Sequence, residues 1–215
     1  KQGFFRLIDN APIAPGVYRM ILGGDTSAVT APGQFVNILL EGRFLRRPIS
    51  VCDCAPDKLS LVYKVVGAGT AQMAALRSGT LDVLTGLGNG YDMTKSGPRP
   101  LLIGGGAGVP PLYMLCRLLM ERGVQPHVLL GFNTASEIFL ERELRSLGAE
   151  VTVTTADGSF GTPGFVTDAM DGIESTYFYA CGPEPMLRAV CRTAKSSGQL
   201  SFEERMGCGF GACMG

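Results

Sequence analysis

The hydrophobic pattern of this 215-residue sequence changes near residue 97. Before that point, short apolar or β-branched runs alternate with turn-forming residues, a spacing typical of antiparallel strands in a small barrel. These runs cover residues 4–8, 17–22, 35–40, 59–66 and 81–84. One helix is expected among them at 71–77, with Thr70 as its N-cap and Gly79 just past its end.

After the change, strands alternate with helices, which indicates βαβ units in a doubly wound parallel sheet. The expected strands are 101–103, 127–131, 151–155 and 176–180, and the expected helices are 110–122, 136–147, 165–170 and 185–197. The predicted architecture is therefore β followed by α/β. An antiparallel β-barrel spans 1–97, a doubly wound α/β domain spans 98–200, and a cysteine-bearing tail begins at 201–215.

The charge and cysteine content exclude several classes of function. Lys and Arg together number 19, as do Asp and Glu, so we expect no nucleic-acid partner and no anionic membrane partner. The longest uncharged apolar stretch, 101–116, is too short and too interrupted by glycine and proline to span a bilayer. Seven cysteines, an odd number in a chain of this size, favour a reducing compartment. With no signal peptide recognised, we expect a cytoplasmic protein.

The single histidine, His127, limits the chemistry further. It falls in an apolar run that reads as a buried strand, where a core or strand-end role is the simplest interpretation. Multi-histidine zinc or iron sites and Rieske centres need more than one histidine and are excluded.

A glycine-rich turn at 104–111, Gly-Gly-Gly-Ala-Gly-Val-Pro-Pro, lies between a predicted buried strand and a helix. Gly104, Gly105, Gly106 and Gly108 would let a pyrophosphate approach backbone N–H groups at the helix start. The alternative is a purely structural turn.

A second candidate, Cys181-Gly182, ends the fourth expected strand, where open α/β sheets bind ligands. A small buried thiol is the alternative interpretation of Cys181.

Three further motifs lie in the barrel region. Arg47-Pro48-Ile49-Ser50 is expected at the end of a barrel strand, where an arginine can bind a pyrophosphate bidentately. Gly67, Gly69 and Thr70 precede the expected helix, whose free N–H groups can hold a phosphate. Gly88, Asn89 and Gly90 form either a turn or the rim of a flat ligand. Taken alone, the arginine motif is better explained as a surface pair, Arg46 and Arg47, before a strand.

The tail carries the most specific motif. Cys208 and Cys213 have the C-x₄-C spacing of plant-type two-iron two-sulfur ligands, and the next ligand of that pattern would be residue 216, one position beyond the sequence. The intervening glycines let backbone N–H groups turn toward cluster sulfides. We expect residues 201–215 to be the start of a cluster-binding segment, the alternative being two simple tail thiols.

In this order, the motifs resemble those of the ferredoxin–NADP reductase superfamily and, within it, the electron-transfer subunits of class B dihydroorotate dehydrogenases. Further matching stretches are Asp157–Gly161 and residues 181–186, so that the resemblance covers nearly the whole chain. Two departures stand out: Ile49 replaces a tyrosine of plant-type reductases, and Thr85-Gly86 replaces a Gly-Pro.

The resemblance implies three cofactors: FAD, NAD and a two-iron two-sulfur cluster. It implies that Arg47 contacts the FAD pyrophosphate and Ser50 the flavin ring. It also implies that a phosphate of FAD is bound by Gly67, Gly69 and Thr70. Gly88, Asn89 and Gly90 would lie near flavin and nicotinamide, Gly104–Gly108 would hold the NAD pyrophosphate, and Cys208 and Cys213 would ligate the cluster. No Arg or Lys occurs at 131–137 to bind a 2′-phosphate, which favours NAD over NADP.

The implied function is electron transfer for pyrimidine biosynthesis. An FMN-containing catalytic dehydrogenase subunit, in a heterotetramer, would oxidise dihydroorotate, and electrons would pass through the cluster and FAD to NAD. No side chain of this chain is required as general acid or base. The rival interpretations are the small subunit of a NADH-dependent ferredoxin:NADP oxidoreductase or hydrogenase-type diaphorase, a nucleotide-binding scaffold without chemistry, and a stand-alone flavin reductase.

Overall fold

Strand pairing in the computed structural model separates the chain into two units. The structure describes residues 1–202, 206, 207 and 209. Lys1–Gly90 forms the first unit, to which Gly209 also belongs, and the second unit begins at Tyr91. This division falls before the predicted boundary at 97/98 because Tyr91 and the segment after it pack with the second unit.

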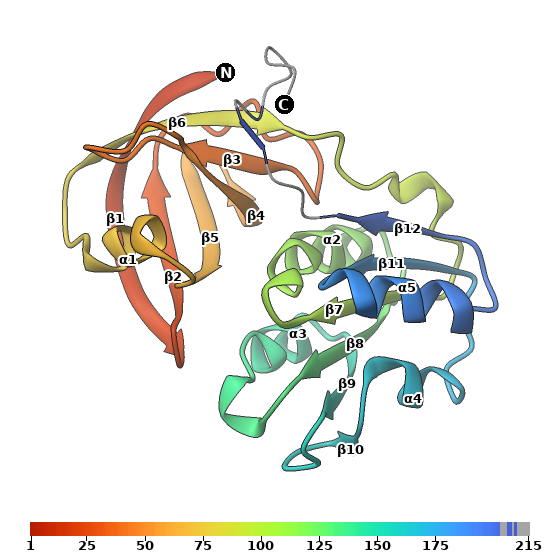
Figure 1. Ribbon diagram of the computed structural model, residues 1–215. Helices are drawn as coiled ribbons and strands as arrows, with labels where there is room; N and C mark the ends of the chain where they lie inside the picture. The colour runs from red at the N-terminus through yellow and green to blue at the C-terminus, as the bar shows by residue number, and fades with distance from the viewer. Residues whose placement is uncertain (203–205, 208, 210–215) are drawn as a thin grey trace. The chain divides into compact units, whose positions relative to one another are not determined.

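The first unit is a closed six-stranded antiparallel barrel (Figure 1). Its strands run in the order β1-β2-β5-β4-β3-β6, and β6 pairs back onto β1. Alternate residues fill the interior, including the fully buried Phe5, Met20 and Leu61. The strand bounds are β1 Gln2–Ala14, β2 Val17–Gly23, β3 Phe35–Ile38, β4 Arg47–Ala55, β5 Lys58–Lys64 and β6 Thr80–Leu87.

Helix α1, Ala68–Ala75, begins earlier than the sequence predicted. Gly67 is its N-cap, and Thr70 lies inside the first turn, so the prediction of Thr70 as N-cap was wrong. The Thr70 hydroxyl accepts hydrogen bonds from the backbone N–H groups of Val66 (2.9 Å) and Gly67 (3.2 Å). A threonine that reaches back in this way stabilises a helix start from inside the helix, which the sequence pattern alone does not distinguish from capping.

The second unit is built on a six-stranded parallel sheet in the order β10-β9-β8-β7-β11-β12. The central strands are almost fully buried, as expected of a sheet covered on both faces. The short edge strands β10 and β12 had not been predicted. The bounds are β7 Pro100–Gly105, β8 His127–Phe132, β9 Glu150–Thr155, β10 Thr162–Pro163, β11 Tyr177–Cys181 and β12 Gly198–Ser201.

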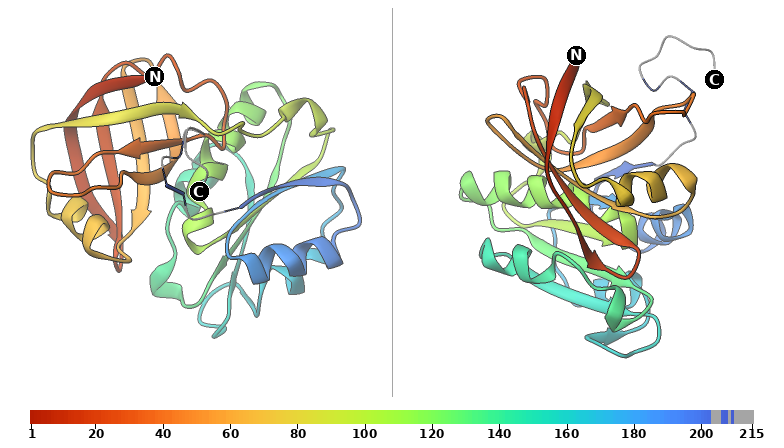
Figure 2. Two further views of the ribbon diagram at one scale, coloured as in Figure 1. Left: turned by 45° about the horizontal axis from the view of Figure 1, so that its top comes forward. Right: turned by 90° about the vertical axis from the view of Figure 1, so that its left-hand side faces the viewer.

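Helices lie on both faces of this sheet (Figures 1 and 2). α4 and α5 cover one face through a buried cluster that includes Leu101, Val166 and Leu187. α2 and α3 lie on the other face. The arrangement is the doubly wound one that the strand–helix alternation predicts. The bounds are α2 Pro110–Glu121, α3 Glu141–Ser146, α4 Val166–Met170 and α5 Glu184–Thr193.

The helix predicted at 136–147 is interrupted, so that prediction was wrong. A short 3₁₀ turn at Ala135–Glu137 is followed by Leu140 in the left-handed region, with φ 61°, and α3 starts only at Glu141. Phe139 and Leu140 are both buried, and the Phe139 ring packs edge-on against Phe132. Burial of these two consecutive apolar side chains overrides the helical pattern.

His127 opens β8 and is half-buried, as a strand-end histidine should be. Its Nε2 lies 2.8 Å from the Thr152 hydroxyl on β9. Burial lowers the pKa of His127 below its ordinary value, an effect that the Glu150 carboxylate partly opposes. The side chain joins two strands and lies outside the candidate ligand sites.

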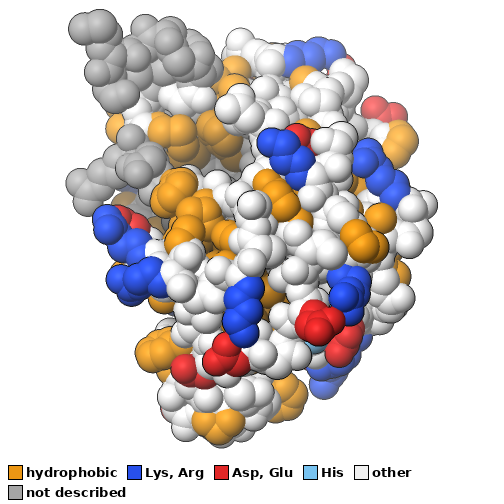
Figure 3. Space-filling model, turned by 90° about the vertical axis from the view of Figure 1, so that its right-hand side faces the viewer, with side chains coloured by type: hydrophobic (Ala, Val, Ile, Leu, Met, Phe, Trp, Pro, Cys, Tyr) orange, Lys and Arg blue, Asp and Glu red, His pale blue; other side chains and the backbone are white. Residues whose placement is uncertain are grey.

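The surface is mixed in charge. On the face shown in Figure 3, basic and acidic side chains are interspersed rather than gathered into one field. Within the part of the chain that the structure describes, no helix is both long and apolar enough to cross a membrane.

Candidate functional site

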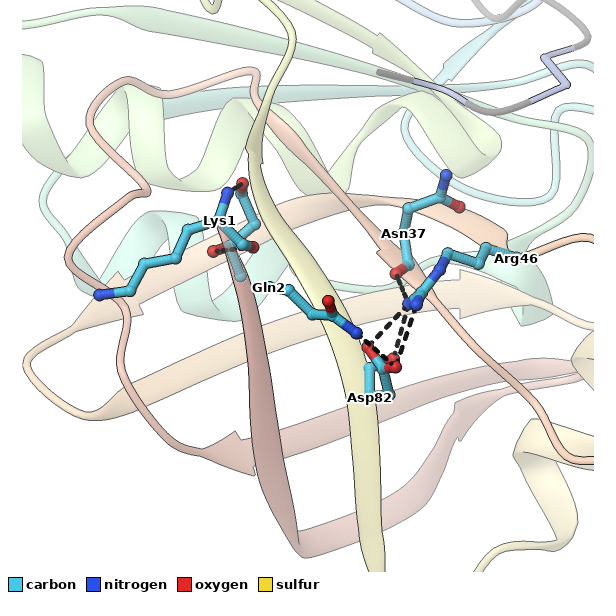
Figure 4. Close-up of polar contacts among 6 residues, drawn as sticks. Lys1, Gln2, Asn37, Arg46 and Asp82 are labelled. Atoms are coloured by element: carbon cyan, nitrogen blue, oxygen red, sulfur yellow. Dashed lines mark hydrogen bonds and ion pairs between the residues drawn. The ribbon is translucent and has the colours of Figure 1, made fainter. Parts of the chain in front are cut away.

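Arg46 and Arg47, at the start of β4, have different surroundings. Arg46 forms a two-pronged ion pair with Asp82 of β6, with both N–O distances 3.0 Å, and also donates to the Asn37 and Asp82 carbonyls (Figure 4). Gln2 adds a hydrogen bond to the same carboxylate. Hydrogen bonding from Arg46 holds the pKa of Asp82 below its ordinary value. Arg46 is therefore committed to joining β3, β4 and β6.

Arg47 points elsewhere, toward the start of α1. A methyl group added to Gly69 would lie 1.9 Å from Arg47 Nε, so the guanidinium occupies the space that a side chain at Gly69 would fill. The first backbone hydrogen bond of α1 is donated by Ala71 to the Gly67 carbonyl, which leaves the N–H groups of residues 68–70 available to an anion. A guanidinium beside free helix N–H groups suits a pyrophosphate, and we call this group the barrel cradle.

The rest of the predicted flavin motif lies along β4. Arg47 begins this strand, so the prediction that the motif ends a strand was wrong: the pairing of β4 with β3 starts at Arg47 and Ile38. Pro48 is exposed, Ile49 is buried in the barrel, and Ser50 is partly exposed. The stretch thus follows the alternation of a strand, with Ser50 remaining available to a ligand.

Backbone conformation and close packing require glycine at several positions of 86–90. Gly88 and Gly90 have φ values of 79° and 72°, and a side chain at Gly90 would clash with Ala31 at 2.6 Å. The buried Gln34 side chain joins the two segments, accepting from Thr30 and Ala31 and donating to the Gly88 carbonyl at 3.0 Å. Asn89 is exposed. Close packing on residues 28–35 therefore explains these glycines without a ligand.

The glycine turn of the second unit has both packed and open positions. A side chain at Gly105 would meet Met186, and one at Gly108 would lie 2.2 Å from the Cys181 carbonyl oxygen. Gly106, by contrast, has φ 50° and open space where a side chain would be. The turn is thus fixed against the β11–α5 connection on one side and free on the other. We call this the dinucleotide cradle.

Cys181 and Gly182 stand directly across from this turn. β7 and β11 are neighbours, and the chain leaves them in opposite directions, toward β8 and toward β12. Such a switch point opens a crevice at the carboxyl ends of the strands, where dinucleotides bind. The Cys181 side chain is buried, and a side chain at Gly182 would meet Met186. The structure thus brings together the candidates predicted at 104–108 and 181–182.

Two residues near Cys181 had not been predicted. The Tyr91 hydroxyl lies 3.4 Å from the Ala180 carbonyl oxygen, and Ser201 is the strand partner of Cys181 on β12. Tyr91 follows the glycine run directly, which offered the only sequence signal for it. Ser201 belongs to an edge strand with little hydrophobic character, and no sequence signal pointed to it.

The residues that follow β8 and β9 lie beside the dinucleotide cradle, at the same edge of the sheet, and we call them the rim. Glu137 accepts hydrogen bonds from the backbone and the side chain of Asn133, and Ser159 accepts from the Ala135 N–H. Hydrogen bonds from Ser159 lower the pKa of Asp157, so its carboxylate is ionised at neutral pH. The rim therefore carries negative charge, in accord with the predicted preference for NAD over NADP.

The predicted cluster ligands Cys208 and Cys213 lie outside the described residues. Gly209 is described, and a side chain there would meet Asn37 on β3 at 2.6 Å. Among the described residues, no group of three or more metal-binding side chains comes together.

Comparison with known proteins agrees with these features. Residues 102–192 match the family model of the oxidoreductase NAD-binding domain. A solved NADH-dependent reduced ferredoxin–NADP oxidoreductase is 30% identical with a TM-score of 0.88, covering 98% of this chain and 80% of that one. The cytochrome b5 reductase domain of Ulva prolifera nitrate reductase, 19% identical with a TM-score of 0.77, covers 93% of this chain and 97% of that one and shares the fold. The class is an NAD-binding oxidoreductase with an N-terminal barrel, which confirms the predicted fold.

Curated relatives narrow the class. The electron transfer subunit of dihydroorotate dehydrogenase B (NAD(+)) from Shouchella clausii is 42% identical, over 99% of this chain and 86% of that protein. The subunit of the same name from a Geobacillus strain is 43% identical, over 99% and 87%. The chain belongs to the family of dihydroorotate dehydrogenase B electron transfer subunits, and the resemblance seen in the sequence is confirmed.

Proposed function

We propose that this chain is the FAD- and NAD-binding subunit that passes electrons from a dihydroorotate-oxidising partner to NAD. When bound, FAD supplies the exchange between single electrons and a hydride pair that such a junction needs. The observation that carries the proposal is the barrel cradle, in which Gly69 leaves room for Arg47 beside the start of α1.

The residues of this chain bind and orient rather than transfer protons. Arg47 and the N–H groups at the start of α1 would hold the FAD pyrophosphate, and Ser50 would contact the flavin ring. The dinucleotide cradle would hold the NAD pyrophosphate around Gly106, with Cys181 near the nicotinamide. The one histidine, His127, is bonded to Thr152 away from this crevice, so it does not serve there as a general base.

Several finer points belong to the proposal. The partner is an FMN-containing catalytic dehydrogenase subunit, assembled with this chain as a heterotetramer. A partner of this kind is supported by the relatives, which are named as electron transfer subunits. Cys208 and Cys213 begin the ligand set of a two-iron two-sulfur cluster, supported by their spacing. The described cysteines form no disulfide with one another, and Cys191 is exposed, which supports a cytoplasmic location.

A visible absorption spectrum of the anaerobically purified protein, with and without NADH, tests the proposal. We expect flavin bands near about 450 nm that bleach with NADH, over a broad shoulder beyond about 550 nm from the cluster. Flavin bands without the shoulder would remove the cluster from the proposal. A protein that stays colourless after addition of FAD would refute it.

A second candidate is the small subunit of a NADH-dependent ferredoxin–NADP oxidoreductase, favoured by the high structural similarity to that protein. The two candidates differ in partner and electron donor. Flavin reduction by dihydroorotate in the complex purified from cells supports the first, whereas reduction by reduced ferredoxin but not by dihydroorotate supports the second.

A further inference from the structure

Three polar side chains gather at the carboxyl ends of β11 and β12, and the proposed electron path leaves two of them without a role. Cys181 and Ser201 are paired in register on these parallel strands. Tyr91 lies against the same place, with its hydroxyl 3.4 Å from the Ala180 carbonyl oxygen. All three residues belong to the second unit, so their arrangement is defined within one body.

The Tyr91 ring is held along one face of β11. It packs edge-on against Tyr179, with ring centroids 5.4 Å apart. Tyr179 and Cys181 are two positions apart on the strand and therefore face the same side of the sheet. A ring seated on Tyr179 consequently directs its hydroxyl toward Cys181.

The segment after Tyr91 is braced as well. The Tyr179 hydroxyl donates to the Asp92 carbonyl at 2.9 Å, and Gln199 of β12 both donates to that carbonyl and accepts from the Asp92 N–H. The backbone at 91–92 is thus tied to β11 and β12 at once. Tyr91 is therefore held in place at the carboxyl ends of these strands.

The Tyr91 hydroxyl keeps its proton. Burial raises the pKa of Tyr91 well above its ordinary value, the neighbouring Cys181 raises it further, and a hydrogen bond with Ser201 lowers it. A protonated hydroxyl both donates and accepts, so it can serve the Ala180 carbonyl and the adjacent thiol or serine hydroxyl together.

Cys181 is also fixed from the opposite side, because Gly108 packs directly on its carbonyl group. The thiol therefore lies where the dinucleotide cradle meets β11, at the nicotinamide end of the crevice. We infer that Tyr91, together with Ser201, positions the Cys181 thiol at the nicotinamide end of the NAD site. This inference rests on the proposed function.

Tyr91→Phe keeps the ring and removes the hydroxyl, and stopped-flow reduction of the flavin by NADH in the complete protein measures its effect. We expect a rate about three- to tenfold lower than that of the native protein, with NADH affinity changed less than about twofold. The long-wavelength charge-transfer band between nicotinamide and flavin should shift in Tyr91→Phe. Tyr177→Phe, which removes a hydroxyl from the same aromatic group, is the matched control and should leave both unchanged.

A double-mutant cycle with Cys181→Ala separates positioning from simple stability. If Tyr91 acts through the thiol, Tyr91→Phe has no further effect on the rate when Cys181 is alanine. An undiminished effect in that background, or an unchanged rate in Tyr91→Phe alone, would overturn the inference while leaving the proposed function intact. A native protein whose flavin NADH cannot reduce would overturn both.

Discussion

Substituting Gly69 by alanine separates ligand binding from folding in the barrel cradle. The added methyl would lie 1.9 Å from Arg47 Nε and 2.7 Å from Cζ. These atoms belong to a flexible side chain, so the arginine moves away and the backbone does not have to shift. Alanine is also favoured over glycine in a helix. The variant should therefore fold as well as the native protein, with Arg47 displaced from the start of α1.

The expected loss is that of one charge-assisted contact to the FAD pyrophosphate. Such contacts contribute about 1.5–3 kcal/mol, which corresponds to FAD binding about 10- to 150-fold weaker. Titration of the apoprotein with FAD, followed by quenching of flavin fluorescence, measures the dissociation constant, and thermal unfolding of the apoprotein checks the fold.

Two comparisons make the result decisive. Gly172→Ala introduces the same methyl at an open position of the other unit and should leave FAD affinity unchanged. In an Arg47→Gln background, Gly69→Ala should weaken FAD binding no further, since both changes remove the same contact. If Gly69→Ala alone binds FAD as tightly as the native protein, the barrel cradle is not the pyrophosphate site.

Three further changes test the structure. In Gly108→Ala the methyl would meet the Cys181 carbonyl at 2.2 Å, and because backbone lies on both sides we expect a loss of about 1–3 kcal/mol, seen as a lower unfolding temperature, with a raised KM for NADH. Asp82→Asn should lower the free energy of unfolding by about 1–2 kcal/mol at pH 7, allowing for solvent screening. Arg46 lowers the Asp82 pKa from 3.8 in the folded protein, so the native carboxylate loses its stabilising effect as pH falls through that lowered pKa. The difference between variant and native protein in urea unfolding should therefore vanish in acid. Burial lowers the His127 pKa from 6.5, so the unfolded chain binds the proton first and stability falls as pH drops below that value; His127→Gln should remove this part of the acid sensitivity.

Much of the fold was readable from the sequence because hydrophobic period and turn residues agree along most of it. The barrel strands begin and end with such turns, and the buried runs of β7 and β8 admit few alternatives. The failures occurred where tertiary contacts decide. Leu140 adopts a left-handed conformation to bury itself beside Phe139, and Thr70 stabilises α1 from within rather than at its cap.

The sequence predicted those parts of the candidate site where a close neighbour leaves room only for glycine. It did not predict those parts whose residues belong to no recognisable motif. Gly108 has to be small because Cys181 lies against it, and that requirement is visible as a motif. The separate roles of Arg46 and Arg47 were not visible, since only the position of Asp82 across the barrel shows which arginine forms an ion pair within the fold. Tyr91 and Ser201 come to Cys181 from two remote segments, a proximity that no local pattern encodes.

Closure of the barrel decides how another protein can bind to this unit. Because β6 pairs with β1 through Gln2–Arg6, each strand of the described barrel has a neighbouring strand on both sides. The barrel therefore offers less unpaired backbone to an added strand than an open sheet does, and a subunit bound there is expected to recognise mainly side chains. The parallel sheet differs, since no strand among the described residues pairs with the outer side of its edge strand β12.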